Sequence, residues 1–191
     1  MVRRMFFQKV KEAGEPILQG AVRASVLERD FFKEVKVNQA ATRQAFLIVV
    51  LVAVASGIGS LDEGGLDGLR TLPTGIVLNL VGWVVWASLS YIIGTKLLAT
   101  PSTQANWSHL ARTLGFAQSP GILRILGIIP GLGISISIVT IVWQFIAMVI
   151  AIRITLNYES NFRAFGVIAL GFVPYLFIVV FLVLLAENQI S

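Results

Sequence analysis

Charged residues are absent from four long stretches of this sequence. Between Gln44 and Ala186 only ten residues are charged, and residues 44–61, 71–95, 125–152 and 164–186 contain no Asp, Glu, Lys or Arg. A bilayer core about 30 Å thick is crossed by roughly 20 apolar residues in a helix. The chain as a whole is 13% charged, against about a quarter in an ordinary soluble domain. The pattern therefore predicts a membrane protein that crosses the bilayer several times.

The predicted fold is all-α: a polytopic membrane helix bundle of about five transmembrane helices, with an N-terminal amphipathic helix. The stretch 120–152 would measure about 50 Å as one helix, and Pro130-Gly131-Leu132-Gly133 is a turn signal that divides it into a hairpin. Whether the short span before this turn begins earlier, near Leu110, or only dips into the membrane stays open. The boundaries expected are 1–43 for a cytoplasmic or interfacial segment, 44–191 for the bundle, and 45–60, 74–95, 120–132, 134–152 and 164–186 for the spans.

The N-terminal segment carries nine Lys/Arg and five Asp/Glu in its 43 residues. Its apolar residues recur at helical spacing from Ile17 to Val35, while its charges lie off that stripe, as an amphipathic helix requires. Two interpretations are open. The helix lies on an anionic leaflet, or it packs on the bundle or on a partner.

The distribution of basic residues predicts the topology. Short cytoplasmic loops carry the excess of Lys and Arg. With five crossings and the N-terminus inside, Lys96, Arg112, Arg153 and Arg163 join the basic N-terminal segment on the inner side, and only Arg70 is outside. We therefore expect a cytoplasmic N-terminus and an external C-terminus.

Several chemistries lack the residues they need. The chain has no Cys and a single His, His109, so thiol chemistry and a histidine metal cluster are not expected. The acids are confined to the N-terminal segment, one loop, Glu159 and Glu187, and no catalytic constellation is evident. We expect no enzymatic activity, no metal and no cofactor. Nucleic-acid binding is not expected either, because topology explains the net charge of +5.

Arg124 is the most informative ionisable residue, because it lies in an apolar run where a charge costs several kcal/mol. One interpretation has it reach lipid phosphates at the inner interface. The other is a buried pair with a carboxylate, a lipid headgroup or a partner subunit. Trp107 suits an interfacial belt, whereas Trp143 lies deep in a span, where it packs in the core or meets a lipid. The candidates for lipid or partner contact are Arg124, Arg112, Trp107, Trp143 and Arg153.

Polar residues also occur inside the spans. Ser137, Thr140 and Gln144 fall on one face of the predicted span 134–152. They indicate hydrogen bonds between helices or, alternatively, a pathway for a solute. A transporter usually adds ionisable residues at the membrane midplane or inverted repeats, and neither is evident.

Several segments together resemble prokaryotic Yip1-domain membrane proteins. They are Phe32–Ala45 running into Ala53–Gly59, Gly94–Leu98, Arg112–Leu123, Ile129-Pro130, Trp143 and Ala151–Tyr158. The resemblance covers about residue 25 to the C-terminus and implies a five-helix bundle with a cytoplasmic N-terminus in a bacterial inner membrane. Eukaryotic relatives are linked to Rab GTPases and vesicle traffic. Their Tyr-Gly-Pro type signature is not evident here, so a Rab-type role is not carried over.

The function expected is that of a non-enzymatic membrane protein with a scaffold or membrane-organising role. The first alternative is a small accessory subunit of a larger bacterial respiratory or photosynthetic membrane complex. The second is a channel or transporter for a small solute. The partners expected are the lipid bilayer and, under the accessory-subunit alternative, other membrane-protein subunits.

Overall fold

Helices make up the architecture of the computed structural model, which describes residues 16–61 and 67–187, with side chains up to residue 61 and from 72 to 185. No strand occurs in these ranges, and the predicted all-α membrane bundle is confirmed. A helix over residues 16–25 comes first. It is followed by α2 (Arg29–Val37), α3 (Ala41–Gly59), α5 (Asp67–Ile92), η1 (Ile93–Leu97), α6 (Trp107–Ala117), η2 (Ser119–Ile128), α7 (Gly133–Thr155) and α8 (Asn161–Glu187).

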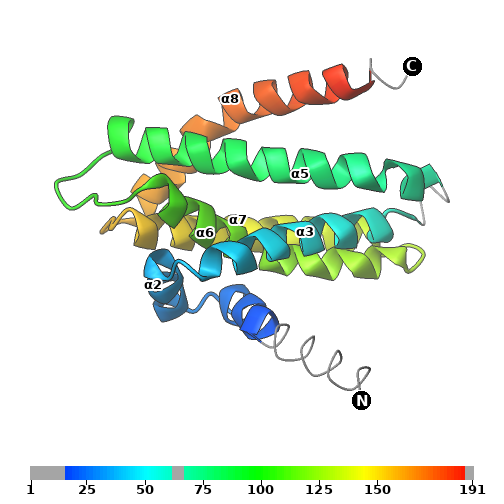
Figure 1. Ribbon diagram of the computed structural model, residues 1–191, viewed down its shortest axis with the longest axis horizontal. Coiled ribbons are helices and arrows are strands. Elements are labelled where there is room, and N and C mark those ends of the chain that lie inside the picture. The colour runs from blue at the N-terminus through cyan, green and yellow to red at the C-terminus, as the bar shows by residue number, and fades with distance from the viewer. Residues whose placement is uncertain (1–15, 62–66, 188–191) are drawn as a thin grey trace.

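Four helices are long and apolar enough to cross a bilayer: Ala41–Gly59, Leu72–Leu97, Gly133–Thr155 and Asn161–Leu185. The shortest has 19 residues, about 28 Å at 1.5 Å per residue, which matches a hydrocarbon core of about 30 Å. They run along the long axis of the molecule (Figure 1). The predicted spans 45–60, 74–95, 134–152 and 164–186 overlap these four helices.

A fifth segment of membrane length combines two kinds of helix. The span predicted at 120–132 is instead the second half of a longer segment, in which the α-helix α6 passes into the 3₁₀-helix η2. Their 11 and 10 residues give about 16 Å and about 20 Å. Pro120 occupies the first turn of η2, where its missing N–H costs nothing, and α6 precedes it from Trp107, near the earlier start at Leu110 that was left open.

The α6–η2 segment packs along α3 in the same direction. Gly115 faces Ala45 near the start of α3, and Gly127 meets Gly59 at its end. A turn at residues 129–132 then reverses the chain into α7, and Gly131 adopts a φ of 80° there, a value that glycine tolerates without strain. The helical hairpin predicted at Pro130–Gly133 is present.

The N-terminal amphipathic segment is two helices rather than one. Leu27 has a φ of 61°, which breaks the helix between residues 25 and 29. Arg23 spans this break, donating to Glu28 at 2.6 Å and to Glu34 at 3.0 Å. Both helices pack on the bundle, as one of the two predicted alternatives required. Phe31 of α2, for example, meets Phe116 of α6 edge to face at a ring distance of 5.1 Å.

The bundle has two chemically different ends. At one end lie α2 and the loops 98–106 and 156–160 (Figure 1). There Lys36 of α2 donates to Asn157 at 3.0 Å, and Asn157 donates to the carbonyl of Ser102 at 3.2 Å. At the other end lie the 129–132 turn and the last turns of α8 (Figure 1). We call the end that contains α2 and the loops 98–106 and 156–160 the basic end.

Candidate functional site

Arg124 projects from η2 into the bundle, between α3 and α7. Its Nε donates to the Thr140 hydroxyl at 3.1 Å, and its Nη1 donates to the Ser56 hydroxyl at 3.4 Å. Its Nη2 donates to the side-chain oxygen of Gln144. In a 3₁₀-helix, residues three apart lie on one face, so Gly121 and Gly127 flank Arg124. Their lack of side chains leaves the guanidinium room to reach both neighbouring helices.

Arg124 lies far from the basic end along the bundle. Its backbone lies beside Gly59, the last residue of α3, at the end of the bundle opposite the basic end. Its partners Thr140 and Gln144 follow the first residue of α7 by about 10 and about 16 Å along the helix. A guanidinium at that depth lies near the middle of a core about 30 Å thick.

The partners of this charge are neutral. An arginine carries five N–H donors, and three hydrogen bonds to Thr140, Ser56 and Gln144 satisfy part of them. Within the described ranges, every salt bridge joins residues of the N-terminal helices, and none reaches Arg124. The positive charge is therefore solvated by hydroxyl and amide oxygens but is not neutralised by the described side chains.

Gln144 links the charge to the α6–η2 junction. Its side-chain oxygen accepts from Arg124, and its Nε2 donates at 2.9 Å to the backbone carbonyl of Gln118. Gln118 stands where the α-helix ends. The polar face predicted on α7 is thus a contact between helices. Thr140 and Gln144 are both buried.

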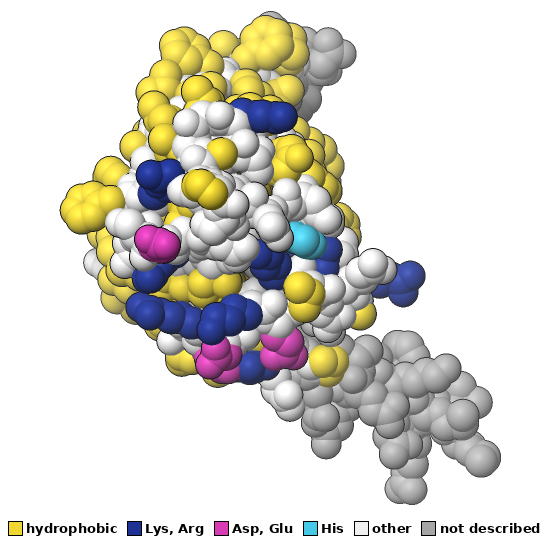
Figure 2. All heavy atoms as spheres, turned by 90° about the vertical axis from the view of Figure 1, so that its left-hand side faces the viewer, with side chains coloured by type: hydrophobic (Ala, Val, Ile, Leu, Met, Phe, Trp, Pro, Cys, Tyr) yellow, Lys and Arg dark blue, Asp and Glu magenta, His cyan; other side chains and the backbone are white. Residues whose placement is uncertain are grey.

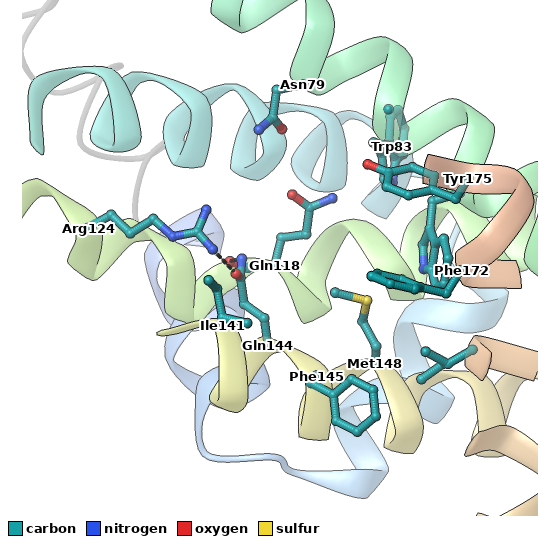
Figure 3. A pocket seen from close by; sticks show the side chains of 13 residues that line it. Asn79, Trp83, Gln118, Arg124, Ile141, Gln144, Phe145, Met148, Phe172 and Tyr175 are labelled. Carbon is teal, nitrogen blue, oxygen red and sulfur yellow. Dashed lines mark hydrogen bonds between the residues drawn. The ribbon is translucent and has the colours of Figure 1, made fainter. Parts of the chain in front are cut away.

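A cavity of about 420 Å³ opens beside this network, between α5, α7, α8 and the start of η2. Figure 3 shows Arg124, Gln118, Gln144 and Asn79 on one side of the cavity, with Ile141 among them, and most of the aromatic side chains on the other. The polar group is Arg124, Gln118, Gln144 and Asn79, and the apolar group includes Trp83, Phe172, Tyr175, Met148 and Phe145.

Two features of the cavity wall bear on what it can hold. Among the described side chains, the indole Nε1 of Trp86 is buried without a hydrogen-bond partner, and Trp86 lines the cavity. Phe145 and Phe172 also line it, yet 38% and 53% of their surfaces are exposed. The cavity therefore reaches the outer surface of the bundle.

The other predicted candidates lie away from this cavity. Arg112 is buried in α6, where its guanidinium folds back on the carbonyl and hydroxyl of Ser108, both at 2.9 Å. Arg153 ends α7 and donates to Asn161 at 3.0 Å. Trp107 donates to the Ser88 hydroxyl at 3.0 Å. Trp143 donates at 2.7 Å to the carbonyl of Ser25, which fastens the first helix to α7.

His109 takes part in a helix cap. The Asn106 side chain accepts from the backbone N–H of His109 at 2.9 Å, and His109 Nδ1 faces the Asn106 N–H in return. Within the part of the chain that the structure describes, no three His, Cys, Asp or Glu side chains gather closely enough to hold a metal ion.

Basic side chains gather at the basic end, where Figure 2 shows them over its surface with fewer acidic ones between them. Lys36 lies partly buried there, and this desolvation lowers its pKa. The basic side chains are Arg23, Arg29, Lys33, Lys36, Arg43, Lys96, Arg153 and Arg163, and the acidic ones are Glu28, Asp30, Glu34 and Glu159. The predicted outer residue Arg70 has its side chain outside the described residues.

Sequence reasoning identified Arg124, Thr140 and Gln144 separately but did not connect them. It missed Ser56 and the carbonyl of Gln118, which complete the network. The spacing of Gln118, Gly121, Arg124 and Gly127 at intervals of three was the available signal, because this repeat matches a 3₁₀-helix.

These features define a multi-pass α-helical membrane protein with a polar centre and a basic end. A family model of the Yip1 domain matches residues 24–184, and the chain belongs to the Yip1-domain family. No curated protein and no solved structure gave a significant match.

Proposed function

We propose that this protein is a non-enzymatic, membrane-organising protein whose basic end binds anionic lipid headgroups on the cytoplasmic leaflet. The observation that carries the proposal is the gathering of basic side chains at the end where α2 docks (Figures 1 and 2). Anionic leaflets attract such clusters by about 1 kcal/mol for each basic residue near the surface. Under this proposal the N-terminus is cytoplasmic, the C-terminus is external, and the membrane is a bacterial inner membrane.

The orientation is tested with reporters that distinguish the two sides of the membrane. A fusion after Ser191 should report an external position, and a fusion after Asn157 should report a cytoplasmic one. A cytoplasmic signal at Ser191 would contradict the five-crossing orientation.

Lipid binding is tested on the full chain in nanodiscs made of equal parts anionic and neutral lipid. Native mass spectrometry of the released protein should show retained lipid enriched in the anionic species. The triple variant Arg29→Gln, Lys33→Gln, Arg43→Gln should lose that enrichment, and so should high salt, which screens exposed charges. The matched variant Asp30→Asn, Glu34→Gln removes negative charges, rather than positive ones, from the same surface. It should keep the enrichment in anionic lipid. Equal retention of neutral and anionic lipid by the unmodified chain would refute the proposal.

A second candidate function, that of an accessory subunit in a larger membrane complex, is favoured by α8. This helix diverges from α5 towards its C-terminal end (Figure 1), and Phe177 and Phe181 on it are 75% and 61% exposed. An apolar helix standing apart offers a surface to another transmembrane helix. Stoichiometric co-purification with a larger complex in mild detergent would favour this candidate. A lone species that moves no solute in liposomes would favour the first, and solute flux would favour a channel or transporter.

A further inference from the structure

We propose that the cavity between α5, η2, α7 and α8 binds a single-chain anionic lipid, with its carboxylate or phosphate at Arg124. The apolar chain of this lipid lies along the aromatic side of the cavity. This binding site is separate from the surface at the basic end, and it does not depend on which side of the membrane that end faces.

The charge of Arg124 favours an anionic ligand. An uncompensated arginine at the middle of a membrane-spanning helix is costly unless it finds a partner. Arg124 is held by three neutral acceptors, and it forms no salt bridge within the described ranges. An oxyanion beside the guanidinium forms shorter and stronger charge-assisted hydrogen bonds than these neutral groups do. The site therefore favours an anionic ligand over a neutral one.

The arrangement of the cavity wall favours a ligand with one charged end and one apolar end. Ligand sites are typically concave, of about 300–1,000 Å³, mostly apolar, with a few polar groups that fix orientation. This cavity has about 420 Å³, and its polar and aromatic side chains are segregated (Figure 3). Segregation of this kind matches a molecule with one charged end and one apolar end. A free inorganic anion would leave the aromatic side without a partner.

The cavity is open to the bilayer. Phe145 and Phe172 line the cavity and are substantially exposed on the bundle surface, which hydrocarbon surrounds in a bilayer. Trp86 and Tyr175 meet edge to face at a ring distance of 5.2 Å, next to Pro174 in the middle of α8. A lipid chain can thus enter from the bilayer without crossing water.

The wall also provides hydrogen-bond donors beyond Arg124. The Asn79 amide lines the cavity on its polar side, and so does the amide of Gln118 (Figure 3). A carboxylate or phosphate has several acceptor oxygens and can satisfy more than one such donor. Fatty carboxylates and lipid phosphates both offer such oxygens, and the displacement experiment below distinguishes between them.

The experiment uses the full chain in an uncharged detergent and a brominated stearic acid as probe. Bromine quenches tryptophan fluorescence at short range, and Trp83 and Trp86 both line the cavity. Quenching by the acid should saturate, whereas its methyl ester, which lacks the charge, should quench only weakly and without saturation. Displacement by dodecanoate and by dodecyl phosphate then shows whether the site prefers a carboxylate or a phosphate.

Two variants test the residues, with a matched control. Arg124→Gln should weaken the saturable quenching at least tenfold, whereas Arg153→Gln, which removes an arginine at the basic end, should leave it unchanged. Ile168→Phe keeps Arg124 and narrows the cavity from α8, so it should also weaken binding. Ile168→Phe keeps the test decisive if Arg124→Gln does not fold, as judged by size-exclusion chromatography.

The outcomes are distinct from those of the lipid-retention test at the basic end. Equal quenching by the acid and its ester would overturn the cavity proposal, because partition into the micelle would then explain both. Unchanged quenching in folded Arg124→Gln would overturn it as well. The triple variant Arg29→Gln, Lys33→Gln, Arg43→Gln should bind the probe normally, so failure of one proposal does not imply failure of the other.

Discussion

Gly59 and Gly127 bring the ends of α3 and η2 into direct backbone contact. A Cβ placed on Gly127 would lie 2.8 Å from the carbonyl oxygen of Gly59, and the backbone cannot yield there as a flexible side chain could. Glycine at both positions allows the close approach that packs helices in membranes. This contact fixes the depth of Arg124, which lies three residues before Gly127 on the same face of the 3₁₀-helix.

Gly127→Val should therefore destabilise the bundle. Overpacking of a closely packed contact typically costs about 1–3 kcal/mol, and we expect a loss in this range in the free energy of unfolding. The measurement is unfolding in mixed detergent followed by circular dichroism. Gly75→Ala is the matched control, because a Cβ there meets no atom within 4 Å. A Gly127→Val protein as stable as this control would contradict the contact.

Hydropathy was sufficient to locate the four long helices, because hydrocarbon selects uncharged stretches whatever their packing. It failed at α6, where several polar side chains form hydrogen bonds within the helix and its cap. Arg112 folds back on Ser108, and Asn106 caps the first turn. A segment with such local bonds enters a bundle although its composition looks like that of a loop.

Two other features depend on geometry that composition does not record. The break at Leu27 places a leucine at positive φ, a conformation that leucine seldom adopts. The polar network joins Arg124 to Ser56, which is 68 residues away, and to α7. The contacts of Arg124 with Ser56 and with α7 could not be assigned before the direction of η2 along α3 was known.

Gln144→Leu should destabilise the protein through the two groups it leaves unpaired. Gln144 accepts from Arg124 and donates to the Gln118 carbonyl, and a buried polar group without a partner costs about 1–3 kcal/mol. We expect a loss of that order in the free energy of unfolding. Ser135→Ala on the exposed side of α7 is the control and should change stability little. Equal stability of the two variants would show that the network does not support the fold.

Asn157 supports the basic end through its backbone and its side chain. Its φ is 55°, a left-handed conformation that costs most residues about 1–2 kcal/mol but that Asn and Gly adopt readily. Its side chain accepts from Lys36 and donates to Ser102. Asn157→Ala should lose both contributions, whereas Asn157→Gly should lose only the side-chain bonds, so Asn157→Ala should be the less stable variant by about 1–2 kcal/mol. Thermal unfolding of both variants measures this order, and a more stable Asn157→Ala would contradict it.

The junction between the two N-terminal helices should loosen in acid. The hydrogen bond from Arg23 lowers the pKa of Glu28 below its usual value of 4.5, and it raises the pKa of Arg23. A carboxylate whose pKa is lowered by folding contributes stability above its unfolded pKa, and that contribution disappears as the pH falls through the folded value. Docking of the first helix should therefore be constant near neutral pH and weaken below about pH 4.

Trp143 provides a local readout of this change, because its indole N–H donates to the Ser25 carbonyl of the first helix. Its fluorescence should shift as the pH falls below about 4, and in Glu28→Gln, which lacks the titrating group, that part of the shift should be absent. Asp30 has its own pKa lowered chiefly by its hydrogen bond from Lys33, and Arg23 bonds Glu28 and Glu34 instead, so Asp30→Asn should retain the shift. If Glu28→Gln and the unmodified protein titrate identically, Arg23 and Glu28 do not hold the junction. The positive φ of Leu27 and the packing of the two helices on α6 and α7 would then have to account for it alone.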